Sequence, residues 1–280
     1  MLRSILAALD DTEPSRAAQD IAIRLAREYS AEITGLAILD RQHIAAPTAV
    51  GIGGMAYKVH RDQVKLEQAH RFLERLEHHF EATCEDLGTP WRVIEAEGNP
   101  FELICGEAHR HDLLVIGRDT DFHLDEAPAV ADVVHRLLEE NPRPVIVCPE
   151  HAETEGPILA ASDGGARSSR TIHMLALLGL ARRRPVHVMA VAGGAHGDGD
   201  AHLYAERPAE LLRRYGIDVE VHPIHSSAQP EDVIAEHAER VGATMVAFGA
   251  SGHGRLRDFF LGSTARRLLN RCACALFVHH

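Results

Sequence analysis

The sequence predicts an α/β protein made of two similar doubly wound domains, each a five-stranded parallel sheet between layers of helices. Three observations support this class: landmarks that recur in the same order, short apolar runs without alternation, and segments with apolar residues three and four positions apart. With 280 residues, 45% of them hydrophobic, the chain is long enough for two globular units with packed cores.

The first landmark is a short apolar run that ends in an aspartate. It reads ILAALD in residues 5–10 and ILAASD in residues 158–163, 153 positions later. Later landmarks are separated by only 130 to 132 positions, which places an insertion of about twenty residues in the first copy, between Asp40 and a helix that begins near Tyr57. The domains are therefore predicted to span residues 1–150 and 156–280, with a polar, unpatterned segment between them.

Each copy reads as an alternation of strand and helix that begins and ends with a strand. The apolar runs typical of strands buried on both faces include residues 113–116, 145–147 and 245–248. The segments with the spacing of amphipathic helices include residues 15–29, 168–182 and 230–241. Right-handed crossovers between such strands give a doubly wound sheet. Arg182, Arg183 and Arg184 are expected to end the second of these helices, where cations suit the helix dipole.

Charge and composition exclude several classes of function. A formal net charge of −12 opposes a large nonspecific contact with nucleic acid or anionic lipid. No apolar stretch reaches the roughly 20 residues that cross a bilayer, and the first ten residues lack signal-peptide features, so a cytoplasmic location is expected.

The five cysteines are expected to be reduced thiols. The many histidines are assigned to solvated helix surfaces, as at His78 and His79, and no metal site is expected.

The strongest functional signal follows the fourth strand of the second copy, where residues 249–264 read GASGHGRLRDFFLGST. Glycines let backbone N–H groups approach an anion, and a helix that begins at Ser263 offers unpaired amides and a favourable dipole. Arg255 and Arg257 add positive charge. Asp163, after the first strand, comes to the same edge of the sheet, where its carboxylate can accept hydrogen bonds from a nucleoside.

This segment resembles the ATP loop of the universal stress protein family, in which Gly-x2-Gly-x9-Gly is followed by Ser or Thr; Gly249, Gly252, Gly262 and Ser263 match every position. The resemblance covers both halves. It implies Rossmann-like domains of the adenine nucleotide α-hydrolase type that pair through their last strands. It also implies ATP as the ligand, with Mg²⁺ accompanying it, or ADP or AMP. The residues assigned to the nucleotide are Ala161, Ser162, Asp163, Val191, Gly249, Ser251, Gly252, His253, Gly254, Arg255, Gly262, Ser263 and Thr264.

The first copy departs from this pattern. Its sequence after Gly117 has no second glycine, and residues 130–132 read VAD where the second copy has GST. Acidic residues crowd this loop and would oppose a triphosphate. This site is therefore expected to hold no ATP, although Asp10 and Asp11 remain at the strand edge. The first domain is expected to act as an internal partner for the second.

The sequence has no nucleophile elbow, Walker A lysine, kinase catalytic loop or HExxH motif, so no catalytic residue is assigned. The main hypothesis is a nucleotide-binding stress or regulatory module with an unidentified protein partner; a homodimer is left open. One alternative is a slow ATPase or nucleotidyl-transfer enzyme, and another is an interaction module that binds no nucleotide. Residues 51–56 fit the variant dinucleotide fingerprint GxGxxA, but they lie in the insertion and are interpreted as a loop or partner-contact segment.

Overall fold

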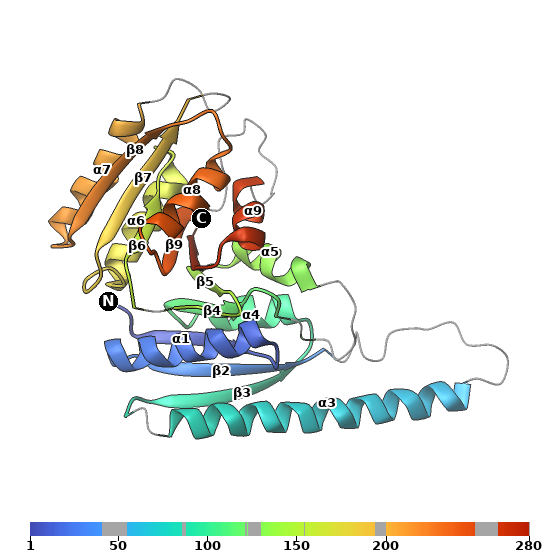
Figure 1. Cartoon of the computed structure of the whole chain (residues 1–280). Helices are drawn as coiled ribbons and strands as arrows, with labels where there is room; N and C mark the ends of the chain where they lie inside the picture. The colour runs from blue at the N-terminus through green and yellow to red at the C-terminus, as the bar shows by residue number, and fades with distance from the viewer. Residues whose placement is uncertain are drawn as a thin grey trace.

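The structure is a computed structural model that describes residues 1–40, 55–85, 88–120, 122, 130–153, 155–193, 200–249 and 263–279. Its ten strands form one sheet with the order β3-β2-β1-β4-β5-β10-β9-β6-β7-β8 (Figure 1). Neighbouring strands run parallel except at the centre, where β5 and β10 are antiparallel. The predicted α/β class is confirmed, and each half contributes five strands to the sheet.

The strands and helices of the two halves follow each other in the same order. The first half comprises β1 (Ser4–Leu9), α1 (Glu13–Tyr29), β2 (Glu32–Leu39), α3 (Met55–Cys84), β3 (Trp91–Glu97), α4 (Pro100–Ala108), β4 (Leu113–Gly117), α5 (Val130–Glu140) and β5 (Val145–Cys148). The second half comprises β6 (Ile158–Ala161), α6 (Ala166–Leu178), β7 (Val186–Ala192), α7 (Ala201–Arg214), β8 (Val219–His225), α8 (Pro230–Arg240), β9 (Met245–Gly249), α9 (Ser263–Arg271) and β10 (Ala275–His279).

The end of α6 differs from the prediction, which extended this helix to Arg182. It ends at Leu178 because Gly179, at a φ of +83°, closes it in the left-handed conformation, with its N–H bonded to the carbonyls of Leu175 and Ala176. The three arginines therefore lie beyond the helix. Arg184 donates to the carbonyl of Gly156 at 2.8 Å and to the hydroxyl of Thr244, so it holds the start of the second half rather than a helix end.

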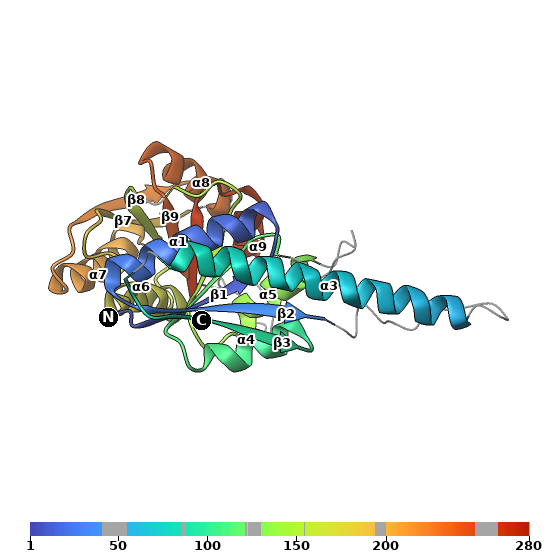
Figure 2. The same cartoon turned by 90° about the horizontal axis from the view of Figure 1, so that it is seen from below.

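Part of the additional length of the first half lies in a helix. Residues 41–54, which include most of the GxGxxA segment, lie outside the described residues, but α3 has 30 residues where α7 has 14. Its carboxyl-terminal part packs on the sheet through buried residues such as Leu73, Leu76 and Phe80. Its amino-terminal part extends beyond the edge of the sheet (Figure 1, Figure 2), and Val59 is 59% exposed there. Part of the insertion therefore lies in α3 itself, whereas the sequence predicted that the whole insertion precedes this helix.

Apolar side chains cover both faces of the sheet, as expected for parallel strands between helix layers. One cluster lies on the face of α1, α3, α6 and α7, and the other on the face of α4, α5, α8 and α9. Each cluster contains residues from both halves, so the cores continue across the centre of the molecule. All five cysteines are free thiols.

The halves meet through their last strands, as the family resemblance implied. Phe277 of β10 pairs with Ile146 of β5, and both side chains are fully buried. Away from the sheet, the hydroxyl of Tyr29 donates to the carbonyl of Gly179 at 3.1 Å, and Arg118 of the first half donates to the carbonyl of Cys272. Within the described residues, no helix combines the length and the hydropathy needed to cross a membrane.

Candidate functional site

The sheet order creates a topological switch point in each half. In the second half the chain leaves β6 toward β7 and β8, and then returns to β9 on the other side of β6. In open α/β sheets, ligands bind in the crevice outside the carboxyl ends of the strands at such a point. The crevice of the second half therefore lies between the turn after β6, which carries Asp163, and the end of β9 at Gly249.

Asp163 is held by the first turn of α6. Its Oδ1 atom accepts hydrogen bonds from the backbone N–H of Gly165 at 2.8 Å and from the hydroxyl of Ser168 at 2.5 Å. Gly164, between Asp163 and Gly165, has a φ of +72°, and a Cβ on this residue would lie 2.4 Å from the ring of Tyr204. The turn is thus fixed by a glycine conformation and by the aspartate, and this places a carboxylate at the crevice beside a helix amino terminus.

Gly249 brings the two sides of the crevice into contact. A Cβ on this residue would lie 2.7 Å from the backbone nitrogen of Ser168, so only a glycine allows the first turn of α6 to pack on the end of β9. Gly117 has the same role in the first half, where a Cβ would lie 2.5 Å from the backbone nitrogen of Ser15. Packing therefore explains why both halves keep this glycine although the loops that follow differ.

The structure brings together the candidate residues at the strand ends. Ala161 is the last residue of β6, and Ser162, which follows, is buried and donates its backbone N–H to Met189 of β7 at 2.8 Å. Val191 is the penultimate residue of β7 and is half-buried. The candidates in the glycine loop lie outside the described residues: Ser251, Gly252, His253, Gly254, Arg255 and Gly262. Ser263 is the first residue of α9.

Thr264, in the first turn of α9, points its hydroxyl toward α8. The hydroxyl donates to Glu231 Oε2 at 3.3 Å. This glutamate is 3% exposed, and its other oxygen forms an ion pair with Arg267 at 2.7 Å. The start of α9 is thereby anchored to the start of α8. Of the three arginines in α9, Arg267 pairs with Glu231 and Arg271 pairs with Asp232 of α8.

The corresponding edge of the first half is more enclosed. Asp10 is 4% exposed and Thr120 is 1% exposed, whereas Asp163 and Gly249 are half-buried. Asp10 Oδ1 accepts from the backbone N–H of Asp11 at 2.7 Å, while Arg118 is directed toward the second half. Residues 123–129 of the following loop lie outside the described residues.

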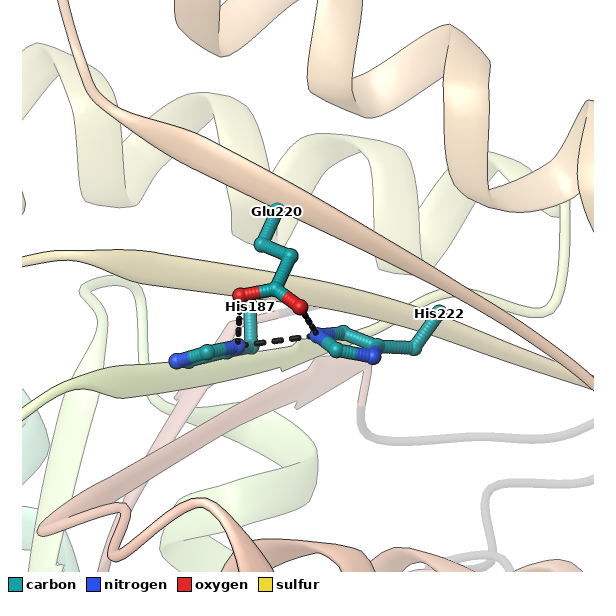
Figure 3. Close-up of side chains that lie close together, drawn as sticks. All are labelled: His187, Glu220 and His222. Carbon is teal, nitrogen blue, oxygen red and sulfur yellow. Dashed lines mark hydrogen bonds and ion pairs between the residues drawn. The ribbon is translucent and has the colours of Figure 1, made fainter.

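A second group of polar side chains was missed by the sequence interpretation. His187 of β7 and Glu220 and His222 of β8 lie together on one face of the sheet (Figure 3). Burial lowers the pKa of His222 and also that of His237, which packs beside it. His78 and His79 are exposed on α3 as expected, but these three histidines belong to the sheet and its covering helix. The spacing of Glu220 and His222, two positions apart in a strand, was a sequence signal for a shared face.

The fold and its crevices define a tandem α/β protein with one potential ligand site at each switch point. The model of the family described as "Universal stress protein family" matches residues 1–149 and again residues 156–280. The chain therefore belongs to the universal stress protein family, which confirms the resemblance found in the glycine loop.

Individual proteins resemble this chain in sequence or in fold. A curated universal stress protein of Synechocystis sp. is 25% identical over 160 residues; the match covers 57% of this chain and 55% of that protein, so it spans about half of the curated relative. A universal stress protein structure from Archaeoglobus fulgidus aligns with a TM-score of 0.67 at 20% identity and covers 98% of this chain and 97% of its own. A functionally unknown protein from Pseudomonas aeruginosa aligns at 0.53 with 16% identity and covers 99% and 92%. These two structures are similar in fold.

Proposed function

We propose that this protein is an adenine-nucleotide-binding module of stress response or regulation, with a single nucleotide site in its second domain. The two domains of the proposal span residues 1–150 and 156–280. One observation carries it: the start of the Gly-x2-Gly-x9-Gly-Ser loop at Gly249 packs on the first turn of α6, whose Ser168 is hydrogen-bonded to Asp163, at a topological switch point. A phosphate-binding sequence is thus joined to a ribose-binding carboxylate at the position where this fold class binds its ligands.

In the proposed complex, the carboxylate of Asp163 accepts hydrogen bonds from the ribose, and the backbone near Val191 faces the adenine. The loop between Gly249 and Gly262 supplies backbone N–H groups to the phosphates, and the amino terminus of α9 adds its dipole. Arg255 and Arg257 of the loop balance the phosphate charge. Mg²⁺ would enter with ATP as its counterion. Occupancy of the loop would then change the surface that a protein partner meets.

The proposal assigns the nucleotide to the second domain because the two edges differ in accessibility and charge. Asp10 is buried, whereas Asp163 is half-buried. The first loop also carries several acidic residues and lacks the second glycine. A polyphosphate there would meet like charge without the loop of free amides that offsets it.

Rapid hydrolysis is not part of the proposed function. A general base must be positioned to take a proton from the attacking water. Asp163 already accepts two hydrogen bonds that hold the turn, and the proposal assigns its carboxylate to the ribose. The second candidate function, a slow ATPase or nucleotidyl-transfer enzyme, predicts phosphate release well above the uncatalysed rate that is abolished by Gly262→Asp.

Calorimetric titration of the full chain with ATP, ADP and AMP tests the proposal, together with mass spectrometry of any ligand released on denaturation. We expect one site per chain. Asp163→Ala should weaken binding by roughly ten- to a hundredfold, as expected for hydrogen bonds to a charged group worth about 1.5–3 kcal/mol. Asp10→Ala changes the equivalent residue of the other half and should leave the affinity unchanged.

Two outcomes would contradict this assignment. No binding at millimolar nucleotide would favour the interaction module without a ligand. Loss of binding in the Asp10→Ala protein, with binding retained in the Asp163→Ala protein, would reverse the roles of the two domains. Thermal melts of both variants establish that they are folded before their affinities are compared.

A further inference from the structure

The strand register places His187, Glu220 and His222 on one face at the edge of the sheet. His187 of β7 pairs with Glu220 of the edge strand β8, and His222 follows Glu220 by two positions. Side chains two positions apart in a strand share a face, and directly paired positions in neighbouring strands do so as well. Figure 3 shows the three side chains pointing toward a common centre.

The distances among these side chains suit a small cation. His187 Nδ1 lies 2.8 Å from His222 Nε2, and each of these nitrogens lies 3.6 Å from a carboxylate oxygen of Glu220. In a tetrahedral zinc site with bonds of 2.0–2.1 Å, neighbouring ligand atoms are about 3.3 Å apart. The observed separations lie on both sides of that value, so the ligand atoms must shift by about half an ångström to bind an ion.

The surroundings offer protection on one side and access on the other. The side chains of His187 and His222 are 15% and 19% exposed, whereas Glu220 is 68% exposed, so an ion can enter along the edge strand. His237 of α8 packs edge-on against His222, with 4.6 Å between ring centroids. Its Nε2 atom is buried and has no hydrogen-bond partner among the described residues. Arg240, whose guanidinium lies 3.4 Å from His237 Nδ1, is paired with Glu236 at 2.8 Å.

We propose that His187, Glu220 and His222 bind one divalent transition-metal cation, and that Zn²⁺ is the ion favoured by this ligand set. Two imidazoles and one carboxylate are a common set for zinc, whereas Mg²⁺ prefers oxygen ligands. The fourth position remains for water or for an external ligand. The 2.8 Å distance between His187 Nδ1 and His222 Nε2 also fits a hydrogen bond between the two imidazoles. The experiment must distinguish this hydrogen bond from metal binding.

The proposed cation site is separate from the proposed nucleotide site. His187 is the second residue of β7, near its amino end, and Val191 is four positions further along. At about 3.3 Å per residue, these positions are roughly 13 Å apart along the strand. A bound ion would join the edge strand β8 to β7, so its first effect would be to stabilise the second half.

Zinc binding can be measured on the full chain after treatment with a chelator and dialysis. Calorimetric titration should give one equivalent of Zn²⁺ per chain, and Zn²⁺ should raise the melting temperature. Mg²⁺ should have neither effect. His222→Gln and Glu220→Gln should each weaken zinc binding by at least about tenfold and abolish the shift in melting temperature. Glu220→Gln changes an exposed side chain of the edge strand, so this variant keeps the test valid if His222→Gln is unstable.

His225→Gln is the matched control, because His225 lies on the same strand but on the opposite face and is exposed. It should bind zinc like the natural protein. Co²⁺ substitution gives an independent reading: the proposal requires a tetrahedral spectrum without a thiolate charge-transfer band. A thiolate band would assign the ion to cysteines and overturn the proposal. Unchanged zinc affinity in both His222→Gln and Glu220→Gln would overturn it as well and leave the imidazole hydrogen bond as the explanation.

Discussion

At the scale of single residues, the glycine that ends the fourth strand of each half has a packing role that needs no ligand. At Gly249 a Cβ would meet the backbone of Ser168 and Arg167, and at Gly117 it would meet the backbone of Ser15 and Pro14. Backbone atoms in the first turn of a helix cannot move aside as the end of a flexible side chain can. The same residue can therefore shape the crevice and begin the glycine loop in the second half.

We expect Gly249→Ala to destabilise the protein by about 1–3 kcal/mol, because the added methyl group overlaps the start of α6. Gly117→Ala should have a similar effect in the first half. Gly106→Ala is the control: it lies inside α4, and apart from its own helix no described atom lies within 4 Å of the added Cβ. This control should stabilise the protein by about 0.5–1 kcal/mol through helix propensity. Urea melts of the three variants check the order; equal effects of Gly249→Ala and Gly106→Ala would contradict the packing argument.

Asp163→Asn separates the structural role of the aspartate from its proposed role in binding. An asparagine retains the oxygen that accepts from Gly165 and Ser168, so the turn should persist, whereas Asp163→Ala should cost about 1–3 kcal/mol of stability through loss of these two hydrogen bonds. Because the asparagine has no charge, its acceptor bonds to a ribose should be weaker. We expect nucleotide affinity to fall in both variants and stability to fall mainly in Asp163→Ala. Calorimetry and thermal melts measure the two effects, and full affinity in the Asp163→Asn protein would remove the carboxylate from the proposed site.

At the scale of elements, the repeated helices α4 and α8 begin with different caps. The side chain of Asn99 accepts from the backbone N–H of Glu102 at 3.2 Å, and Pro100 follows it. The equivalent residue of α8 is Gln229, which has the same extended backbone conformation but makes no side-chain cap bond within the described residues. The longer side chain of glutamine is a poor cap, so the second half lacks a stabilising contact that the first half has.

This difference predicts that removing the cap of α4 destabilises the protein and that introducing a cap at α8 stabilises it. Asn99→Ala should destabilise the protein by about 0.5–2 kcal/mol, and Gln229→Asn should stabilise it by up to about 1 kcal/mol. Denaturant melts of the two proteins measure both changes. If Gln229→Asn left the melting midpoint unchanged, the amide groups at the start of α8 would have to be satisfied in another way.

The sequence predicts elements better than their ends and their side-chain partners. The repeat and the apolar runs locate the strands, because burial on both faces leaves a clear pattern at 113–116 and 245–248. The end of α6 is missed because Gly179 closes the helix while apolar spacing continues past it. The group of His187 and Glu220 is missed because their pairing depends on the register of two strands 33 positions apart in the chain. The glycine loop remains a prediction from its motif.

At the scale of the whole molecule, the antiparallel pairing of β5 and β10 turns two similar sheets into one. The apolar clusters on both faces run through this junction. The hydrogen bond from Tyr29 to Gly179 adds a polar contact between α1 and the end of α6. The first half therefore supports the second through shared core, independently of any ligand of its own.

The junction predicts a dependence of stability on alkaline pH. Burial, with a smaller contribution from Glu28, raises the pKa of Tyr29 to about 12 in the folded protein, against 10.0 for an unperturbed tyrosine. Below pH 10 the phenol is neutral in both states; above it the unfolded state loses the proton first, so the free energy of unfolding should fall between about pH 10 and 12. Tyr29→Phe should show a shallower decline in urea melts over this range. Equal slopes for the two proteins would exclude Tyr29 as the source.

The shared core also predicts that the two halves unfold together. Calorimetry should show one transition whose van't Hoff and calorimetric enthalpies agree, although the chain contains two domains of the same family. Phe277→Ala removes a fully buried ring at the junction and should lower the stability of this single transition by about 3–5 kcal/mol. Leu203→Ala, which changes a partly exposed side chain of α7, should have an effect below about 1 kcal/mol. If Phe277→Ala instead split the transition and left one part at the original temperature, each half would have to be stable alone, and the continuous clusters would not couple them.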